Sequence, residues 1–246
     1  MPESAGALEA QLSPASRGNP DTWLVIRVYN EAPVVRSVVL EALQHFGNVV
    51  CVDDASTDNS AEAILGTGAH LVRHPVNLGA GAALQTGIEY ALRDPLMGQV
   101  VCFDGDGQHD IADAVRLAAR LRSGDVDVVY GSRFLGRSEG IGRTRAHVLR
   151  WGRHFTTWTT GVRLTDPHNG LRGFSRSFAE RVDLQLRDMA YASELVGLIA
   201  KDGTRYAEVP VTVRYTDHSR SKGQSSLNAV TIAFDVSMHQ LAAGRR

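Results

Sequence analysis

The chain has 246 residues, of which 43% are hydrophobic and 22% are charged, a composition typical of a globular protein with one or two domains. No apolar run approaches the about 18 to 20 residues that a membrane-spanning helix needs, so the sequence predicts no such helix. The net charge of −1 hides an asymmetry, because residues 1–132 carry −9 and residues 133–226 carry +7. This division predicts carboxylates for a divalent cation in the front half and arginines for phosphates in the back half. The alternative is that two solvated surfaces differ by chance.

Residues 1–21 mix Ser, Pro, Gly and single charges without an apolar segment, which predicts a disordered leader rather than a signal peptide. Cys51 and Cys102 each lie near the end of an apolar run. We therefore expect buried, reduced cysteines and a cytoplasmic protein.

From residue 22 to residue 130, apolar runs of strand length alternate with helical spacing. Strands are expected at 23–28, 49–52, 71–73, 99–103 and 126–130, and helices at 35–46, 60–65, 80–92 and 111–122. Asp110 is the expected cap of the last of these helices. Apolar strands separated by helices predict a parallel sheet that helices cover on both faces.

After Gly131 the pattern changes. Residues 143–160 and 194–201 are expected to be helical, residues 170–174 extended, and residues 205–215 a strand exposed on one side. A polar loop is expected at 216–226, followed by a helix at 227–242 whose apolar stripe indicates core packing rather than membrane contact. The sequence thus predicts a front half at 22–135, a back half at 136–226 and a terminal helix at 227–246, together forming one catalytic domain.

Acidic residues cluster where the predicted strands end. Glu31 follows the first strand, Asp53 and Asp54 follow the second, and Asp104 and Asp106 follow the fourth. Ligands of open α/β folds bind at the carboxyl ends of parallel strands. The acidic residues therefore predict a binding site at this edge of the sheet.

The segment from Asp104 to Asp110 gives the strongest local signal. Asp104, Asp106 and Gln108 offer oxygen atoms at every second position, the ligand type that Mg²⁺ or Mn²⁺ prefers. An EF-hand is excluded, because His109 stands at the sixth position where that loop needs glycine. His109 is either a ligand or a neighbour of the ligands.

The stretch from Asn77 to Leu84 resembles a dinucleotide-binding turn only in part. Gly79 and Gly81 match its first two glycines, but Leu84 replaces the third, and the stretch follows the third strand rather than the first. We expect small residues here to let a helix begin close to the sheet or to a phosphate.

The ordered set of motifs resembles the family 2 glycosyltransferases of the GT-A fold. The segments that carry the resemblance are Tyr29-Asn30-Glu31, Val52 to Asp58, Asn77-Leu78-Gly79, Asp104 to Gln108 and Gly131-Ser132-Arg133. Asp166 with Gly170 to Phe174, then Arg220 with Gly223-Gln224-Ser225, is similar to the polyprenyl-phosphate branch typified by dolichol-phosphate mannosyltransferase. The resemblance spans residues 22 to 227.

The resemblance implies a GT-A α/β fold, a nucleotide-sugar donor such as GDP-mannose or a UDP-sugar, and a polyprenyl-phosphate acceptor. It implies that the metal is held by Asp104, Asp106 and Gln108. It further implies a donor site of Tyr29, Glu31, Val52, Asp53, Asp54, Gly79 and Asp104. Arg133 and Arg145 would face the acceptor phosphate, and Arg220 would close over the donor phosphates.

The chemistry agrees with these roles. A divalent metal and an arginine stabilise a departing nucleoside diphosphate, which makes Asp106, Arg133 and Arg220 the expected catalytic residues. A phosphate acceptor is already anionic and needs no strong base, whereas a sugar hydroxyl needs one. Glu194 is the candidate base for a hydroxyl acceptor. One in-line displacement predicts inversion at the anomeric carbon.

Three positions depart from the family pattern. Arg27 stands where proline is usual, Ser226 where lysine is common, and Leu149 where relatives have a small polar residue, which weakens the role of Arg145. Many relatives continue into transmembrane helices, whereas none is predicted in this sequence. We therefore expect the chain either to meet a lipid at the inner membrane surface, through its last helix or a small membrane-anchoring partner, or to use a soluble acceptor.

Two other functions stay open on the sequence alone. One is transfer to a sugar hydroxyl of a glycan or small molecule, and the other is a non-catalytic protein that binds nucleotide sugars. No nucleic-acid partner is expected, because the basic half lacks a recognised binding module and interleaved aromatic residues.

Overall fold

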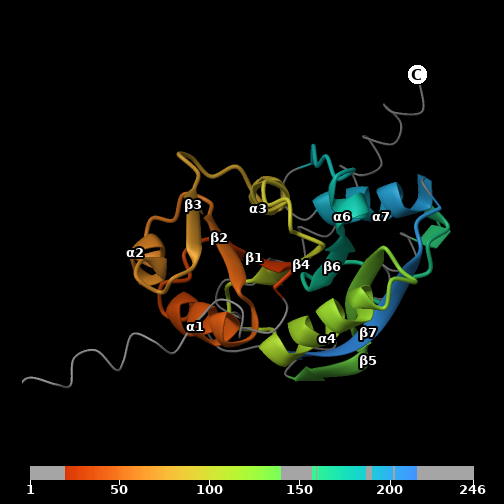
Figure 1. Cartoon of the computed structure of the whole chain (residues 1–246), viewed down its shortest axis with the longest axis horizontal. Coiled ribbons are helices and arrows are strands. Elements are labelled where there is room, and N and C mark those ends of the chain that lie inside the picture. Colours follow the sequence, from red (N-terminus) through yellow and green to blue (C-terminus); the bar gives the residue numbers. More distant parts are fainter. Residues whose placement is uncertain (1–19, 140–156, 159, 187–189, 202, 215–246) are drawn as a thin grey trace, which may run out of the picture.

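A computed structural model describes residues 20–139, 157–158, 160–186, 190–201 and 203–214. The strands in this part of the chain are β1 Thr22–Val28, β2 Asn48–Asp53, β3 His70–Arg73, β4 Gln99–Asp104, β5 Val128–Glu139, β6 Arg172–Ser175 and β7 Tyr206–Arg214. They form one sheet in the order β3-β2-β1-β4-β6-β5-β7 (Figure 1). Pairing is parallel except at β6, which lies antiparallel to β4 and β5.

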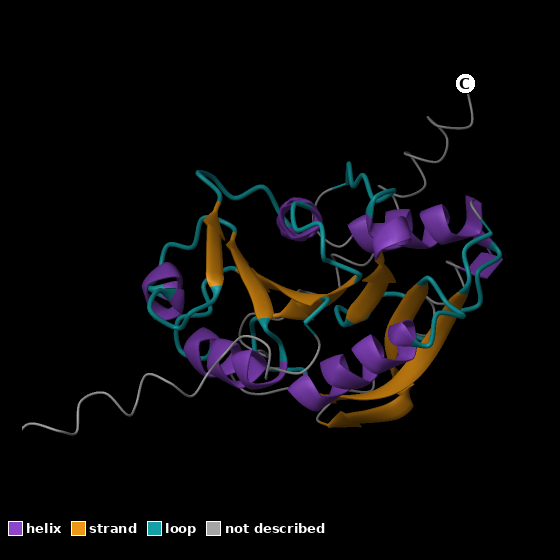
Figure 2. Cartoon of the chain, in the orientation of Figure 1, coloured by secondary structure: helices purple, strands orange, loops and turns teal. Residues whose placement is uncertain are grey.

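Helices cover both faces of this sheet. They are α1 Val35–His45, α2 Ser60–Ile64, α3 Ala80–Leu92, α4 Ile111–Arg122, α6 Arg176–Ala179 and α7 Tyr191–Lys201. Figure 2 shows α1 and α4 on one face and α3, α6 and α7 on the other. Each face has its own apolar cluster, because the central strands are apolar on both sides: Leu24 and Ile26 pack toward α1 and α4, while Val25 packs toward α3.

The mixed α/β architecture with a mostly parallel sheet was predicted from the sequence and is confirmed. The bounds of α3 and α4 match the prediction, and the Asp110 carboxylate accepts a hydrogen bond from the Ala112 N–H as the expected helix cap. Cys51 and Cys102 are buried and free, also as expected. Burial raises the pKa of each thiol to about 12.

The antiparallel strand β6 lies in the segment that the sequence predicted only as extended, without a direction. This four-residue strand is inserted between β4 and β5, and its direction is set by pairing with strands that lie far away in the sequence. The strand expected at 126–130 is the twelve-residue β5, which continues to Glu139 beside β7. The short helix α6 was not predicted, since four residues carry no periodic signal.

The predicted leader, the loop at 216–226, the terminal helix and nearly all of the helix expected at 143–160 lie outside the described residues. The domain boundaries drawn from the sequence stay predictions. Within the described ranges, no helix combines the length and the hydropathy that a membrane crossing requires.

Two helical glycines provide a test of the packing of α3 against the sheet. A Cβ at Gly87 would lie 2.2 Å from Val25 Cγ1, whereas a Cβ at Gly197 of α7 would meet no described atom within 4 Å outside its own stretch of helix. We expect Gly87→Ala to lower the free energy of unfolding by about 1 to 3 kcal/mol through overpacking. Gly197→Ala should raise it by about 0.4 to 1 kcal/mol, because alanine restricts the unfolded chain.

Urea unfolding of both variants measures these changes. Equal midpoints for Gly87→Ala and the parent would contradict the close contact between α3 and β1.

Candidate active site

The acidic residues come together because of the register of the parallel strands. Val28 of β1 pairs with Asp53 of β2, and Arg27 pairs with Asp104 of β4 on the other side. Asp53 and Asp104, which are far apart in the sequence, therefore lie at the same edge of the sheet on either side of β1. The structure thus brings together the strand ends that the sequence singled out.

The loops after β1 and β2 are fastened to each other. Asn30 Oδ1 accepts hydrogen bonds from the N–H groups of Thr57 and Asp58, at 2.8 and 3.3 Å, and the Asn30 N–H donates to Ser56 Oγ. Asn30 and Ala55 have φ angles of +56° and +60°, which are uncommon for residues other than glycine. Such conformations often accompany functional sites, where the surrounding contacts hold them in place.

Glu31 is buried at the start of the first loop, and its N–H donates to Ser60 Oγ at 2.7 Å. Its carbonyl oxygen accepts hydrogen bonds from Val34 and Val35, which lead into α1. The neighbouring Tyr29 is half-exposed. A buried carboxylate beside an exposed aromatic ring is compatible with the donor-binding roles predicted for both residues.

Asp53 and Asp54 are buried and bind parts of the protein itself. Asp53 Oδ1 accepts from the Ser56 N–H, and Asp53 Oδ2 lies 3.0 Å from Arg73 Nε. Asp54 accepts from the N–H groups of Leu78 and Gly79, at 2.9 and 2.8 Å, and contacts the His74 ring. Asp54 therefore fixes the turn that begins α3.

Two further residues of the predicted donor site, Gly79 and Val52, present no side chain to the surface of the site. Gly79, with a φ of +94°, precedes α3 and lacks a Cβ that would be strained there. Val52 is completely buried inside β2. Its side chain is therefore not available to a ligand.

Asp104 already has a cationic partner in the protein. It forms an ion pair with Arg27, and its second oxygen lies 3.8 Å from His109 Nε2. Burial alone would raise the pKa of Asp104, but the neighbouring charge of Arg27 outweighs it and lowers that pKa. Asp104 is consequently ionised at neutral pH.

The positive charge near Asp106 is too small to keep its carboxylate fully ionised at neutral pH. Burial and the charge of Asp104 raise its pKa to about 7, and the charge of Glu31 adds to the rise. The Gln108 N–H donates to Asp106 Oδ1 at 3.0 Å and opposes the shift only in part. The loop after β4 thus holds more negative potential than its protein neighbours neutralise.

These observations test whether the loop suits a divalent cation. Asp104, Asp106 and Gln108 supply hard oxygen donors, and a cation would neutralise the excess negative charge. Among the described residues no three His, Cys, Asp or Glu side chains form a cluster. Mg²⁺ is commonly held by one or two carboxylates together with water and substrate phosphates, so the set fits a cation shared with a ligand.

Arg133 is oriented by Asp166. The Arg133 N–H and Nε donate to the same Asp166 oxygen, at 3.1 and 2.6 Å, and Asn169 Nδ2 donates to it at 3.0 Å. Both partners of the ion pair are buried. Gly170, in the same loop, must be glycine because a Cβ would lie 2.0 Å from Asp104 Oδ2. This loop therefore joins Arg133 to the acidic site.

The remaining predicted residues are placed differently. Both Glu194 oxygens accept from the Gln185 N–H, and Oε2 also accepts from the Leu186 N–H. The carboxylate is therefore occupied with backbone contacts, while its role as a base stays a prediction. Arg145 and Arg220 lie outside the described residues, as do Leu149 and Ser226.

Sequence reasoning missed a stack of cations and aromatic rings beside the acidic loop. The Arg172 guanidinium is fully buried between the rings of Tyr130 and Tyr191, at 5.3 and 5.1 Å, and Arg27 lies 5.2 Å from the Tyr191 ring. Both Nη atoms of Arg172 are buried and have no hydrogen-bond partner among the residues that the structure describes. Arg27 lies inside a predicted apolar strand, and this is the signal that could have identified it. Arg172 lies in the segment 170–174, which was predicted only as extended and gave no comparable signal.

His168 provides a pH test of the same region. Burial and the nearby Arg172 lower its pKa to about 4, although Asp166 opposes the shift. Because the unfolded histidine titrates near 6.5, its contribution to stability is complete above that pH and is lost as the pH falls toward 4. We expect His168→Gln to reduce this loss. Urea unfolding at pH 7, 6 and 5 measures it, and a parent-to-variant difference that does not change with pH would contradict the assignment.

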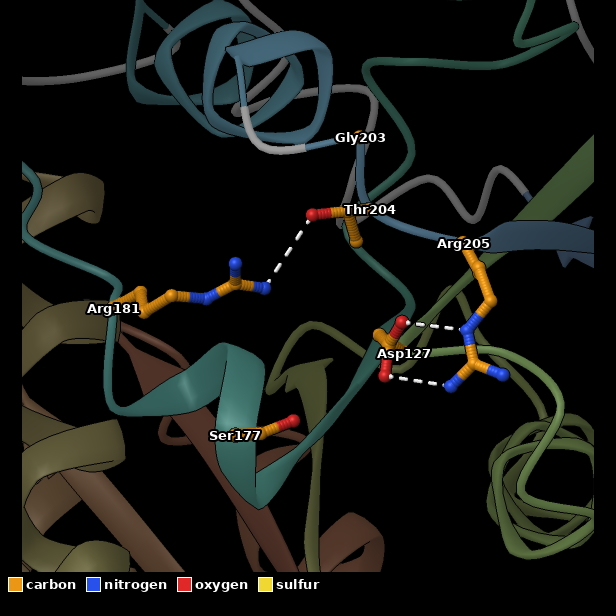
Figure 3. A pocket seen from close by; sticks show the side chains of 6 residues that line it. All are labelled: Asp127, Ser177, Arg181, Gly203, Thr204 and Arg205. Carbon is orange, nitrogen blue, oxygen red and sulfur yellow. Dashed lines mark hydrogen bonds and ion pairs between the residues drawn. The ribbon is translucent and has the colours of Figure 1, made fainter.

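A hollow of about 450 Å³ lies near the starts of β5 and β7 (Figure 3). It is lined by Asp127, Ser177, Arg181, Gly203, Thr204 and Arg205. Asp127 and Arg205 precede β5 and β7 and form a two-point ion pair with each other. Four of its lining residues form two pairs, Asp127 with Arg205 and Arg181 with Thr204, so the acidic edge is the better candidate for chemistry.

The amino-acid sequence matches the family described as "Glycosyl transferase family 2" over residues 23–183. The chain belongs to this family. The match includes β1 to β6, the acidic loops, Arg133 and Asp166. The protein is accordingly a glycosyltransferase, and its α/β architecture is the GT-A fold of this family.

Curated relatives support the same family. An uncharacterized protein of Methanocaldococcus jannaschii is 30% identical over 90% of this chain and 93% of its own length. The UDP-N-acetylglucosamine–dolichyl-phosphate N-acetylglucosaminyltransferase of Methanococcus voltae is 28% identical over 88% and 94%. A dolichyl-phosphate β-glucosyltransferase of Trichomonas vaginalis is 25% identical over 89% and 74%. The chain therefore resembles the polyprenyl-phosphate branch, as its sequence motifs predicted.

Solved structures confirm the fold. Glucosyl-3-phosphoglycerate synthase from Mycobacterium tuberculosis, crystallised with Mn²⁺, UDP and phosphoglyceric acid, superposes with a TM-score of 0.68 at 19% identity. The comparison covers 93% of this chain and 78% of that one. The same enzyme has also been crystallised with Mg²⁺ and UDP. At this identity the likeness establishes a shared fold, which is compatible with a divalent metal.

Proposed function

We propose that this glycosyltransferase moves a sugar from a nucleoside-diphosphate donor to the phosphate of a polyprenyl or dolichyl phosphate, with the help of Mg²⁺ or Mn²⁺. The observation that carries the proposal is the near full-length similarity to an enzyme named for UDP-N-acetylglucosamine and dolichyl phosphate. The acidic loop after β4 supports a bound metal, and the oriented Arg133 supports an anionic acceptor.

Separate groups of residues would bind the metal, the nucleoside and the acceptor. Asp104, Asp106 and Gln108 would hold the cation, which when bound neutralises charge on the departing diphosphate. The strand ends that carry Glu31 and Asp53 would bind the nucleoside. Arg133, held by Asp166, would place the acceptor phosphate in line with the anomeric carbon.

The bond changes require no strong base. An anionic phosphate oxygen of the acceptor attacks the anomeric carbon and forms the new C–O bond. The bond from that carbon to the donor phosphate breaks, and the nucleoside diphosphate leaves with the electron pair. A single displacement inverts the anomeric configuration.

The location follows from the acceptor. A polyprenyl phosphate is embedded in a lipid bilayer, so the reaction would take place at a membrane surface, on its cytoplasmic side. Residues outside the described part of the chain or a small anchoring partner would provide the attachment.

Product analysis tests the proposal. The protein, with Mn²⁺ and a panel of radiolabelled GDP- and UDP-sugars, is offered dolichyl phosphate or a soluble glycan in parallel. We expect label in the organic phase, as an acid-labile lipid phosphodiester. Transfer to the glycan hydroxyl alone would overturn the proposed acceptor, and the rate of that reaction should then depend on Glu194, which Glu194→Gln measures.

A further inference from the structure

Arg27 is placed unusually for a charged residue. It occupies β1, where the neighbouring side chains are apolar and buried, and it pairs in register with Asp104 of β4. The two side chains point to the same face of the sheet and form an ion pair. The Arg27 carbonyl oxygen also accepts a hydrogen bond from the Gly105 N–H at 3.0 Å. The backbone carbonyl and the side chain of Arg27 therefore both bind the start of the acidic loop.

The position of the Arg27 side chain is fixed by aromatic contact. Its guanidinium lies 5.2 Å from the centre of the Tyr191 ring, and only 13% of the side chain is exposed. The Arg172 guanidinium also lies against the Tyr191 ring and so fills part of the space around it. Cation–π contact and burial leave Arg27 one favourable direction, toward Asp104.

The Arg27 guanidinium and a bound divalent metal would therefore compete for the Asp104 carboxylate. Asp104 is the first of the two aspartates that suit a divalent metal, and Arg27 already neutralises one of its oxygens. The second oxygen lies close to His109 and to Gly170, so little room is left beside it. A metal that uses Asp104 fully must displace the guanidinium or share the carboxylate with it.

We propose that Arg27 is a resident counter-ion of Asp104 that competes with the divalent cation and lowers the affinity of the free protein for it. The proposal rests on the proposed function only in assigning the cation to Asp104 and Asp106. A donor diphosphate offers the displaced guanidinium a new anionic partner. Metal and nucleotide therefore bind cooperatively, and each raises the affinity for the other by the same factor.

Direct Mn²⁺ binding tests the competition without any turnover. The electron paramagnetic resonance signal of free Mn²⁺ is followed while the full-length protein is titrated in the absence of nucleotide. We expect Arg27→Met and Arg27→Gln to bind Mn²⁺ at least about tenfold more tightly than the parent, because the Coulomb attraction between Arg27 and Asp104 is removed. Arg27→Lys, which keeps the charge, should stay close to the parent, and Asp104→Asn should bind more weakly.

Thermal unfolding provides a second readout. Without metal, Arg27→Met leaves Asp104 without its partner and should melt below the parent. Added Mn²⁺ should raise its melting temperature by more than it raises that of the parent, because a tighter ligand stabilises the folded state more. Addition of UDP or GDP should increase Mn²⁺ affinity more in the parent than in Arg27→Met.

The outcomes separate this inference from the proposed function. If Arg27→Met and Arg27→Gln bind Mn²⁺ no more tightly than the parent, or if none of the proteins binds it, the competition is wrong even where sugar transfer to dolichyl phosphate is observed. If the affinity rises in both variants but no lipid product forms, the inference stands and the proposed acceptor fails.

Discussion

Asp106→Asn is expected to reduce the rate of sugar transfer by about a hundredfold to a thousandfold, the range over which loss of one stabilising electrostatic group lowers a rate. Asp106 is the carboxylate that the protein leaves least neutralised, since burial and Asp104 raise its pKa to about 7. Asp106 would give up its proton in order to hold a cation there. An amide cannot supply the same charge, so the diphosphate would leave without its main counter-charge.

The measurement is the initial rate with saturating donor and Mn²⁺. Asp125→Asn is the matched control, because Asp125 is an exposed aspartate that pairs with Arg120 away from the acidic edge. It should transfer sugar at the parental rate. The metal-free Asp106→Asn protein should be at least as stable as the parent, since the repulsion from Asp104 and Glu31 is removed.

A chelator should have the same effect on the parent as the substitution. If Asp106→Asn keeps the parental rate, or if the parent is indifferent to chelation, the metal-assisted mechanism is wrong. A variant that has lost activity and also its thermal unfolding transition would report misfolding instead, which the stability measurement detects.

The sequence predicted the front half of the fold because its signals are local. Strands β1 and β4 are largely apolar, with Arg27 as the one charged residue inside β1, and α3 and α4 have unbroken helical spacing between clear ends. The alternation of the two implies parallel strands whose carboxyl ends share one edge. The position of the acidic residues followed from that geometry alone.

The back half was predicted less well because its structure depends on distant pairing. β6 has only four residues, and its antiparallel direction is set by β4 and β5. The extension of β5 beyond Gly131 includes polar residues and shows a shift of register opposite β7. No periodicity within these segments carries that information.

The same distinction applies to the site. Strand-end position identified Asp104 and Asp106, but spacing could not show that Arg27 neutralises the first and leaves the second short of positive charge. Nor could it show that Asp54 fixes the turn before α3 through Leu78 and Gly79. Each of these roles depends on contacts between segments that are 24 or more residues apart.

Asp166→Ala should produce the largest loss of stability among single substitutions around the site. The Asp166 carboxylate is 1% exposed and accepts hydrogen bonds from the Arg133 backbone, the Arg133 guanidinium and Asn169. Its removal leaves the buried Arg133 charge without this partner. Breaking a buried ion pair on one side costs about 3 to 5 kcal/mol, far more than the pair contributes relative to an apolar replacement.

Urea unfolding at pH 7 measures the loss as a lower midpoint with an unchanged slope. Asp127→Ala is the matched control, because Asp127 also makes a two-point pair with an arginine, but Arg205 is exposed and water screens the interaction. Its midpoint should hardly move. Equal losses in the two variants would show that burial does not set the strength of the Arg133–Asp166 pair.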